Sequence, residues 1–180
     1  MTTTRVILTG FMGAGKTEVG RRLGRDLGWR FVDTDALIEA AAGCSVAAIF
    51  AGEGEAKFRA RERQAVAEAC QLADTVIAVG GGALVDPDNR RALLAAGPVV
   101  CLRATPRELL RRLGEARDRP LLNGDGRASE TQRLERIETL LAARAPIYAL
   151  STHTVDTDGC TPDEVVEKVR AIMAGPGGTT

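Results

Sequence analysis

The sequence predicts one α/β domain, in which a parallel β-sheet carries helices on both faces. Apolar runs of strand length alternate along the chain with segments of helical periodicity, as is typical of this fold class. The motif Gly-x-x-x-x-Gly-Lys-Thr, at residues 10–17, follows the first apolar run and precedes a helical segment. Acidic or glycine-rich clusters follow two further runs, at the sheet edge where such folds bind ligands. Together these features predict a domain that binds a phosphorylated ligand.

The composition excludes several functional classes. The chain has 180 residues, of which 44% are hydrophobic and 27% charged, and this suits one globular domain. The formal net charge is zero, so no basic field favours nucleic acid as a partner. No apolar run reaches membrane-spanning length and no signal-peptide pattern is present, so we expect a cytoplasmic protein without a membrane partner. The cysteine spacing does not suit zinc, and the single histidine, His153, argues against His-centred hydrolysis.

The strand predictions rest on short apolar or β-branched runs that end at glycine, proline or acidic residues. The third and fourth runs are continuously apolar, as expected of strands that are buried on both faces. The second run is less apolar and ends in two aspartates. The predicted strands are residues 5–9, 30–35, 75–79, 99–102 and 152–156.

The helix predictions combine apolar spacing with start and stop signals. Gly28 and Gly43 end the first two helices. Thr105 and Thr161 each begin a capping box with proline at the first helical position. The predicted helices run from the motif to about residue 27, over 36–42, from the Ser45 cap to Gly52, over 55–72, from Asp86-Pro87 to Gly97-Pro98, from Pro106, from the Ser129 cap to about 145, and from Pro162 to about 173.

The motif at residues 10–17 predicts a phosphate-binding loop. Gly13, Ala14 and Gly15 allow the backbone to wrap closely around phosphate groups, with N–H groups directed at their oxygens. Lys16 is expected to reach the β- and γ-phosphates, and the Thr17 hydroxyl to ligate Mg²⁺. The guanine motif Asn-Lys-x-Asp does not occur, so GTP is disfavoured as the nucleotide.

The acidic and glycine clusters predict a second site for the acceptor of the phosphoryl group. If Asp33 and Asp35 lie on one strand, both carboxylates point the same way, so that one can support Mg²⁺ and the other can act as base. The alternative is a helix N-cap and a surface acid. Glycines 80–82 leave backbone N–H groups accessible to small anions and hydroxyls, although they would also suit a sharp turn.

Three arginines complete the candidate site. Arg59 and Glu62 share a helix face, a spacing that by itself indicates a solvated ion pair. Arg144 would by itself be an arginine at a helix C-terminus. Residues 114–127 are polar and broken by glycine, which predicts a mobile lid, and Arg119 within it could swing onto the transferred phosphate.

Taken together, these stretches resemble the shikimate kinase family. Their order and spacing agree with that family over residues 6–173. The shared stretches are Gly-Phe-Met-Gly-Ala-Gly-Lys-Thr at 10–17, Phe-Val-Asp-Thr-Asp at 31–35, Glu-Ala-Lys-Phe-Arg at 55–59 with Glu62, Val-Gly-Gly-Gly at 79–82, Arg-Pro-Leu-Leu at 119–122 and Arg-Ala-Pro-Ile-Tyr at 144–148.

The resemblance implies the three-layer P-loop NTPase fold, with a five-stranded parallel sheet, a lid at about 114–127, a substrate-binding helical region at about 34–62 and a tail at 175–180. It also implies transfer of the ATP γ-phosphate to the 3-hydroxyl of shikimate, on the route to chorismate and the aromatic amino acids. A monomer is the default expectation, because the sequence has no long exposed apolar helix.

The resemblance also assigns roles to individual residues. Lys16, Asp35 and Arg119 would be catalytic, with Asp35 binding the reacting hydroxyl as the candidate base, and Asp33 would support the Mg²⁺ shell. The nearby Arg117 leaves open which lid arginine reaches the phosphates. The shikimate carboxylate would be gripped by two arginines, for which bidentate guanidinium groups are well suited. The implied shikimate-binding residues are Asp35, Arg59, Gly80, Gly81, Gly82 and Arg144.

Nucleotide recognition is the least specific part of the resemblance. Arg112 matches the adenine-stacking position, and Pro162 lies near the adenine edge. Pro162 is equally explained as the first residue of a helix.

Two other functions fit part of the pattern. A gluconate or nucleoside monophosphate kinase would share the phosphate loop and often a lid, but Asp33-x-Asp35 with glycines 80–82 favours a polyol acceptor. A nucleotide-binding module without turnover would usually have lost Lys16, Asp35 or an arginine, and this chain retains them.

Overall fold

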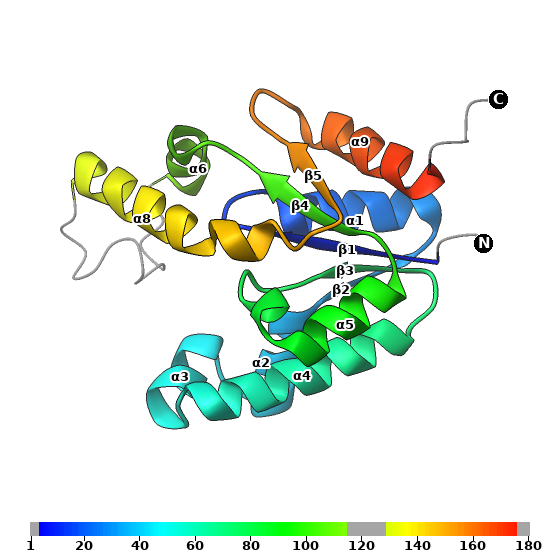
Figure 1. The fold of residues 1–180 in the computed structure, drawn as a ribbon, viewed down its shortest axis with the longest axis horizontal. Coiled ribbons are helices and arrows are strands. Elements are labelled where there is room, and N and C mark those ends of the chain that lie inside the picture. The colour runs from blue at the N-terminus through cyan, green and yellow to red at the C-terminus, as the bar shows by residue number, and fades with distance from the viewer. Residues whose placement is uncertain (1–3, 115–128, 176–180) are drawn as a thin grey trace.

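In the computed structural model, which describes residues 4–114 and 129–175, the chain forms a five-stranded sheet with helices on both sides (Figure 1). Every strand pairing is parallel, and the strand order is β2-β3-β1-β4-β5. The predicted α/β class and five-stranded parallel sheet are confirmed. The strands are β1 (Arg5–Gly10), β2 (Arg30–Asp33), β3 (Thr75–Ala78), β4 (Val99–Arg103) and β5 (His153–Asp156).

Helical segments connect the strands, as parallel pairing requires. Most begin at the caps that the sequence predicts, including the proline-containing starts of α5, α6 and α9. The helices are α1 (Lys16–Leu27), α2 (Thr34–Ala42), α3 (Val46–Gly52), α4 (Glu55–Gln71), the 3₁₀ turn η1 (Ala83–Val85), α5 (Pro87–Ala96), α6 (Pro106–Leu113), α8 (Glu130–Tyr148) and α9 (Pro162–Ala174).

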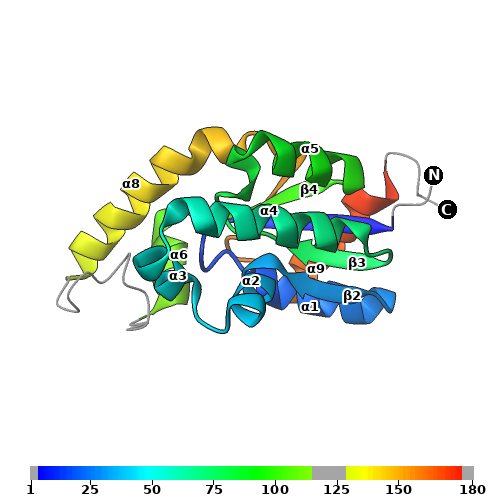
Figure 2. The ribbon, with the colours of Figure 1, turned by 90° about the horizontal axis from the view of Figure 1, so that it is seen from below.

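Helices cover both faces of the sheet (Figures 1 and 2). The side chains of β1 alternate between these two helical layers. Val6 and Leu8 of β1 pack in a core with residues of α1, α6 and α9. Ile7 points to the other face and packs against α4 and α5. Since both faces of the central strands are covered, their continuous apolar runs are explained.

A third, smaller apolar cluster holds α2 and α3 against α4. Its buried members are Ile38, Ile49, Phe58 and Ala65. These helices occupy the region 34–62 that was predicted to be helical. They are therefore anchored to the domain mainly through α4, which also packs on the sheet.

The boundary between β2 and α2 and the end of α8 differ from the predictions by more than one residue. β2 ends at Asp33, because the Asp33 carboxylate caps α2 by accepting a hydrogen bond from the Asp35 N–H at 3.1 Å. The prediction that both aspartates lie on one strand was therefore wrong. Helix α8 continues past residue 145 to Tyr148, with Pro146 inside it, and ends within one turn of this proline.

Within the described residues, no single helix is long and apolar enough to cross a membrane; α2 and α3 pass this test only as a pair bent by 57°. Residues 115–128, which include almost all of the predicted lid, and residues 176–180 of the predicted tail lie outside the described part of the chain.

Candidate active site

The phosphate loop has the geometry that its sequence predicts. Gly13 and Gly15 have φ angles of 80° and 99°, which side chains disfavour. Gly15 is the N-cap of α1 and supplies no capping side chain, so the first N–H groups of this helix face the loop. Lys16 folds back over the loop, where its Nζ donates to the Gly10 carbonyl at 2.8 Å and to the Phe11 carbonyl at 3.2 Å. The loop thus presents a cluster of donors suited to phosphate oxygens.

Asp35 lies in the first turn of α2, half-buried, close to the loop. Burial, and after it the nearby Asp33 and Glu62 carboxylates, raise its pKa to about 6, although Lys16 acts in the opposite direction. A carboxyl group with such a pKa is ionised near neutral pH and can still accept a proton effectively. The alternative reading is therefore half right: Asp33 is a helix N-cap, but Asp35 is half-buried and is not a plain surface acid.

The glycine turn that follows β3 brings the acceptor-site residues together. A methyl group at position 80 would lie 3.1 Å from Asp35 Oδ1. At position 81 it would lie 2.9 Å from Arg144 Nη1, and at position 82 it would lie 3.1 Å from Arg59 Nη1. Glycines 80–82 therefore each face a different predicted site residue, at a distance that leaves no room for a side chain.

Arg59 is held by two carboxylates of its own helix. Its Nη1 donates to Glu62 Oε2 at 2.8 Å, and its Nη2 donates to Glu55 Oε1 at 3.1 Å. The Glu62 side chain is only 2% exposed. The ion pair therefore forms, but the prediction that it is solvated is wrong for Glu62. Burial raises the pKa of Glu62, which the Arg59 guanidinium only partly offsets. The pair fixes the direction of the Arg59 guanidinium toward the glycine turn.

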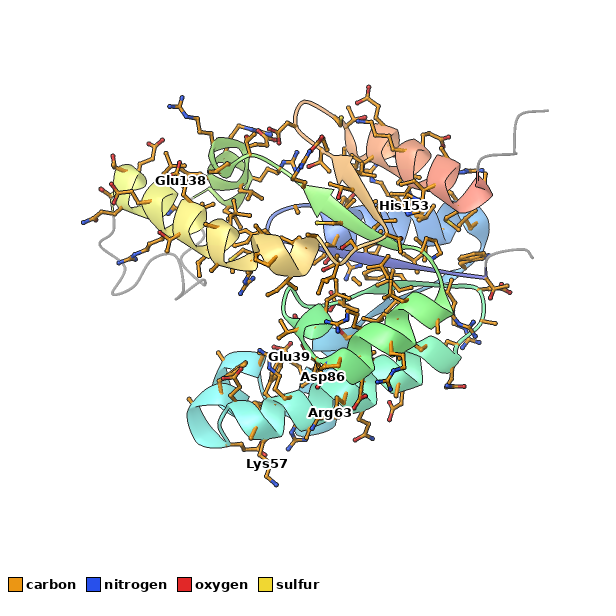
Figure 3. All side chains as sticks on the ribbon, viewed as in Figure 1. Glu39, Lys57, Arg63, Asp86, Glu138 and His153 are labelled. Atoms are coloured by element: carbon orange, nitrogen blue, oxygen red, sulfur yellow. The ribbon has the colours of Figure 1, made fainter. Side chains whose placement is uncertain are left out.

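A second ion pair joins this helix to α5, its neighbour in the same helical layer. Arg63 Nη1 lies 2.9 Å from Asp86 Oδ2, the N-cap of α5, and both residues are labelled in Figure 3. Asp86 also accepts from the backbone N–H groups of Asp88 and Asn89. The pair therefore connects the start of α5 to α4 at Arg63, the residue that follows Glu62.

Arg144 connects the acceptor side to the phosphate loop. Its guanidinium carbon lies 5.6 Å from the centroid of the Phe11 ring, inside the loop. Tyr148, one turn later in α8, also faces position 81. The sequence analysis predicted no separate role for Phe11 or Tyr148. The i, i+4 spacing of Arg144 and Tyr148 indicates that the two side chains share a helix face, but the helix was predicted to end at about residue 145, before Tyr148.

The nucleotide side contains a pocket of about 280 Å³ next to the phosphate loop, lined among others by Ala14, Gly15, Arg112 and Pro162. Arg112 is fixed there, because Nη1 donates to Thr157 Oγ1 at 2.9 Å and Nη2 donates to the Thr157 carbonyl at 2.7 Å. Pro162 is the first residue of α9, as predicted, and it also lines this pocket; its place near the adenine edge stays a prediction.

Glu108 orients Arg112 from the same helix. Arg112 Nε donates to Glu108 Oε1 at 2.7 Å. The Arg111 guanidinium, and after it that of Arg112, hold the pKa of Glu108 at about 2. The carboxylate is therefore ionised at neutral pH and acts as a permanent partner for Arg112.

The predicted metal residues, Thr17 and Asp33, have the chemistry that Mg²⁺ requires. Thr17 is exposed in the first turn of α1, and Asp33 uses Oδ1 for the cap of α2. Among the described residues, no group of three or more His, Cys, Asp or Glu side chains could hold a metal ion. Mg²⁺ typically takes one or two protein oxygens together with water and phosphate oxygens, so these two residues fit it.

The remaining predictions concern the two lid arginines and the single histidine. Arg117 and Arg119 lie outside the described residues. His153, labelled in Figure 3, is exposed on β5, which is an edge strand, as its predicted position at the sheet edge required.

The fold and the loop define a phosphate-loop kinase whose second site is lined by an acid, two arginines and bare backbone. Comparison with known proteins narrows this class. A family model described as shikimate kinase matches residues 12–174. The shikimate kinase of Geobacter metallireducens is 44% identical over 170 residues, which cover 94% of this chain and 92% of the relative. That of Thermus thermophilus is 45% identical over 167 residues, which cover 92% of this chain and 88% of the relative.

Solved structures agree with the sequence comparisons. The shikimate kinase from Acinetobacter baumannii, solved in complex with shikimate, superposes with a TM-score of 0.86 at 32% identity, covering 99% of this chain and 97% of that one. The chain therefore belongs to the shikimate kinase family.

Proposed function

We propose that this protein transfers the γ-phosphate of ATP to the 3-hydroxyl of shikimate, giving shikimate 3-phosphate and ADP (EC 2.7.1.71). This reaction belongs to the route to chorismate and the aromatic amino acids. The observation that carries the proposal is the glycine turn, where positions 80, 81 and 82 face Asp35, Arg144 and Arg59 in turn. An acid for a hydroxyl and two arginines for a carboxylate suit a small polyol acid.

The acceptor is held by charge and by backbone. Arg59 and Arg144 approach the turn from α4 and α8 and bind the carboxylate between them. Glu62 directs Arg59, and the Phe11 ring supports Arg144. The substrate oxygens can approach the N–H groups of glycines 80–82 closely, because no side chain covers these groups.

In the reaction, the acceptor oxygen forms a bond to the γ-phosphorus while the bond from that phosphorus to the β–γ bridging oxygen breaks. ADP leaves with the bonding electron pair, and the hydroxyl proton passes to Asp35. Lys16 and the N–H groups of the loop stabilise the charge that develops on the phosphates. Catalysis therefore rests on positioning and charge neutralisation.

Thr17 and Asp33 would hold Mg²⁺, the first directly and the second through water. The chemistry that Mg²⁺ would supply there is neutralisation of phosphate charge. The adenine base would stack on Arg112, whose plane Glu108 and Thr157 fix, and would lie beside Pro162. We further propose that residues 1–180 act as a single kinase domain, in a cytoplasmic monomer.

Acceptor-dependent ADP release tests the proposal. The protein is supplied with ATP and Mg²⁺ and with shikimate, quinate, gluconate, AMP or CMP in turn. We expect ADP release only with shikimate, and no release from the Asp35→Ala and Lys16→Ala variants, which keep the fold. Release with gluconate or a nucleotide would refute the acceptor assignment, and nucleotide binding without any release would favour a non-catalytic module.

A further inference from the structure

One polar group at the acceptor site has no role in the proposed function. The Tyr148 hydroxyl oxygen is buried beside the Arg144 guanidinium, which can only donate, and no group among the described residues accepts a hydrogen bond from the hydroxyl. Buried hydroxyl groups almost always have a partner, and one that lacks it is an indication of a missing ligand or water. Tyrosine also differs from phenylalanine only by this oxygen, so apolar packing does not require it.

The hydroxyl group lies over the same glycine as Arg144. A methyl group at position 81 would be 2.9 Å from Tyr148 Oη and 2.9 Å from Arg144 Nη1. The two residues are one turn apart on α8, so they present their polar ends on one side of the helix. The guanidinium and the phenol therefore point together into the acceptor site.

The rest of the tyrosine is held by apolar contacts. Its ring packs against the core cluster of α1, α6 and α9, and it lines a pocket of about 550 Å³ together with Phe11 and Leu141. Phe11 in turn supports Arg144. The ring is thus fixed, and its hydroxyl is the only polar atom that this side chain offers to the site.

We propose that Tyr148 is a substrate-binding residue whose hydroxyl donates a hydrogen bond to the carboxylate that Arg144 holds. The inference rests on the proposed function, because it requires a carboxylate at this position. A carboxylate has two oxygens with about four acceptor positions, so it can accept from two arginines and one hydroxyl group. Burial raises the pKa of Tyr148, which keeps the hydroxyl protonated as a donor at neutral pH.

The Tyr148→Phe variant tests this role, because it removes the hydroxyl and keeps the ring. Loss of a hydrogen bond to a charged group corresponds to about a tenfold loss of affinity or more. We expect the KM for shikimate to rise by about tenfold, with the KM for ATP and the melting temperature unchanged. Ser151→Ala is the matched control, since Ser151 Oγ is also buried without a described partner but lies in the turn after α8.

A neutral analogue separates carboxylate recognition from a general structural effect. Shikimate methyl ester keeps the ring hydroxyls and loses the charge, and its affinity is measured as competitive inhibition against shikimate. We expect Tyr148→Phe to change the inhibition constant of the ester by a few-fold at most. An unchanged KM for shikimate, or an equal loss with the ester, would overturn the role of Tyr148. Failure of the wild-type protein to phosphorylate shikimate would instead overturn the proposed function.

Discussion

Replacing Asp35 by asparagine should abolish phosphoryl transfer and yet stabilise the folded protein above about pH 6. The Asp35 carboxylate is desolvated in the first turn of α2, near the Asp33 and Glu62 carboxylates, and these effects outweigh the attraction of Lys16. Asparagine has nearly the same shape and carries no charge. The Asp35 charge therefore destabilises the ligand-free fold although catalysis needs it. The asparagine variant removes this charge.

The magnitude follows from the pKa. The pKa of Asp35 is about 6 in the folded protein, against an ordinary value of 3.8. A difference of about 2 in pKa corresponds to about 3 kcal/mol of unfolding free energy. This is an upper limit, because the asparagine amide must also be desolvated. For a domain of this size, 3 kcal/mol is about 6–12 °C in melting temperature.

The sign of the pH dependence follows from linkage. Because the folded pKa of Asp35 is raised, the folded protein binds this proton more tightly than the unfolded chain does. The contribution of Asp35 to stability therefore falls as the pH rises from about 4 to about 6. The advantage of the asparagine variant should be full above about pH 6, decline below it, and vanish near pH 4.

Urea unfolding of the ligand-free proteins at about pH 4 and about pH 8 measures both effects. The control is Glu138→Gln, the same chemical change at an exposed position of α8 that Figure 3 labels, and it should leave stability unchanged at both pH values. If the asparagine variant is no more stable than the wild type at pH 8, or if its advantage is equal at both pH values, the desolvation argument is refuted.

Three further predictions concern catalysis and binding. If Asp35 must be ionised, kcat/KM for shikimate should rise with pH through about 6, and a profile that is flat across this range would contradict its role as base. Gly81→Ala should displace the ends of Arg144 and Tyr148, raising the KM for shikimate at least about tenfold with little change in melting temperature; backbone destabilisation would show as a lower melting temperature. Arg112→Ala should raise the KM for ATP several-fold and leave that for shikimate unchanged, and the reverse pattern would exclude Arg112 from the nucleotide pocket.

Local patterns were sufficient to predict most elements of the fold. The continuous apolar runs that became β3 and β4 are buried on both faces, as their composition indicated. The predicted caps at Ser129 and Thr161 form complete capping boxes. The strand order was not predicted from these patterns, because it depends on which face each helix crosses, and that is decided by packing between segments distant in sequence.

The acceptor site shows where local reasoning failed. The aspartate pair was predicted on a strand, because alternation is the simplest way to bring both carboxylates to one side. A helix start forms there instead of a longer strand, because the Asp33 carboxylate accepts a hydrogen bond from the otherwise free N–H of Asp35 at the start of α2. The burial of Glu62 was also missed, because a charged helix gives no local sign of the layer that covers it. The raised pKa of Asp35 depends on the same tertiary contacts.

The glycine turn explains why residues from separate parts of the chain form one site. Asp35, Arg59 and Arg144 come from α2, α4 and α8, and their polar ends meet at glycines 80–82. Each would be within 3.1 Å of any Cβ atom at its facing position. Space for the acceptor at this turn thus depends on the absence of side chains. A substitution there leaves the backbone contacts of the sheet intact and displaces the binding groups. We therefore expect the turn to determine acceptor affinity with little effect on stability, unlike Gly10, where a Cβ atom would meet the β4 backbone at Leu102.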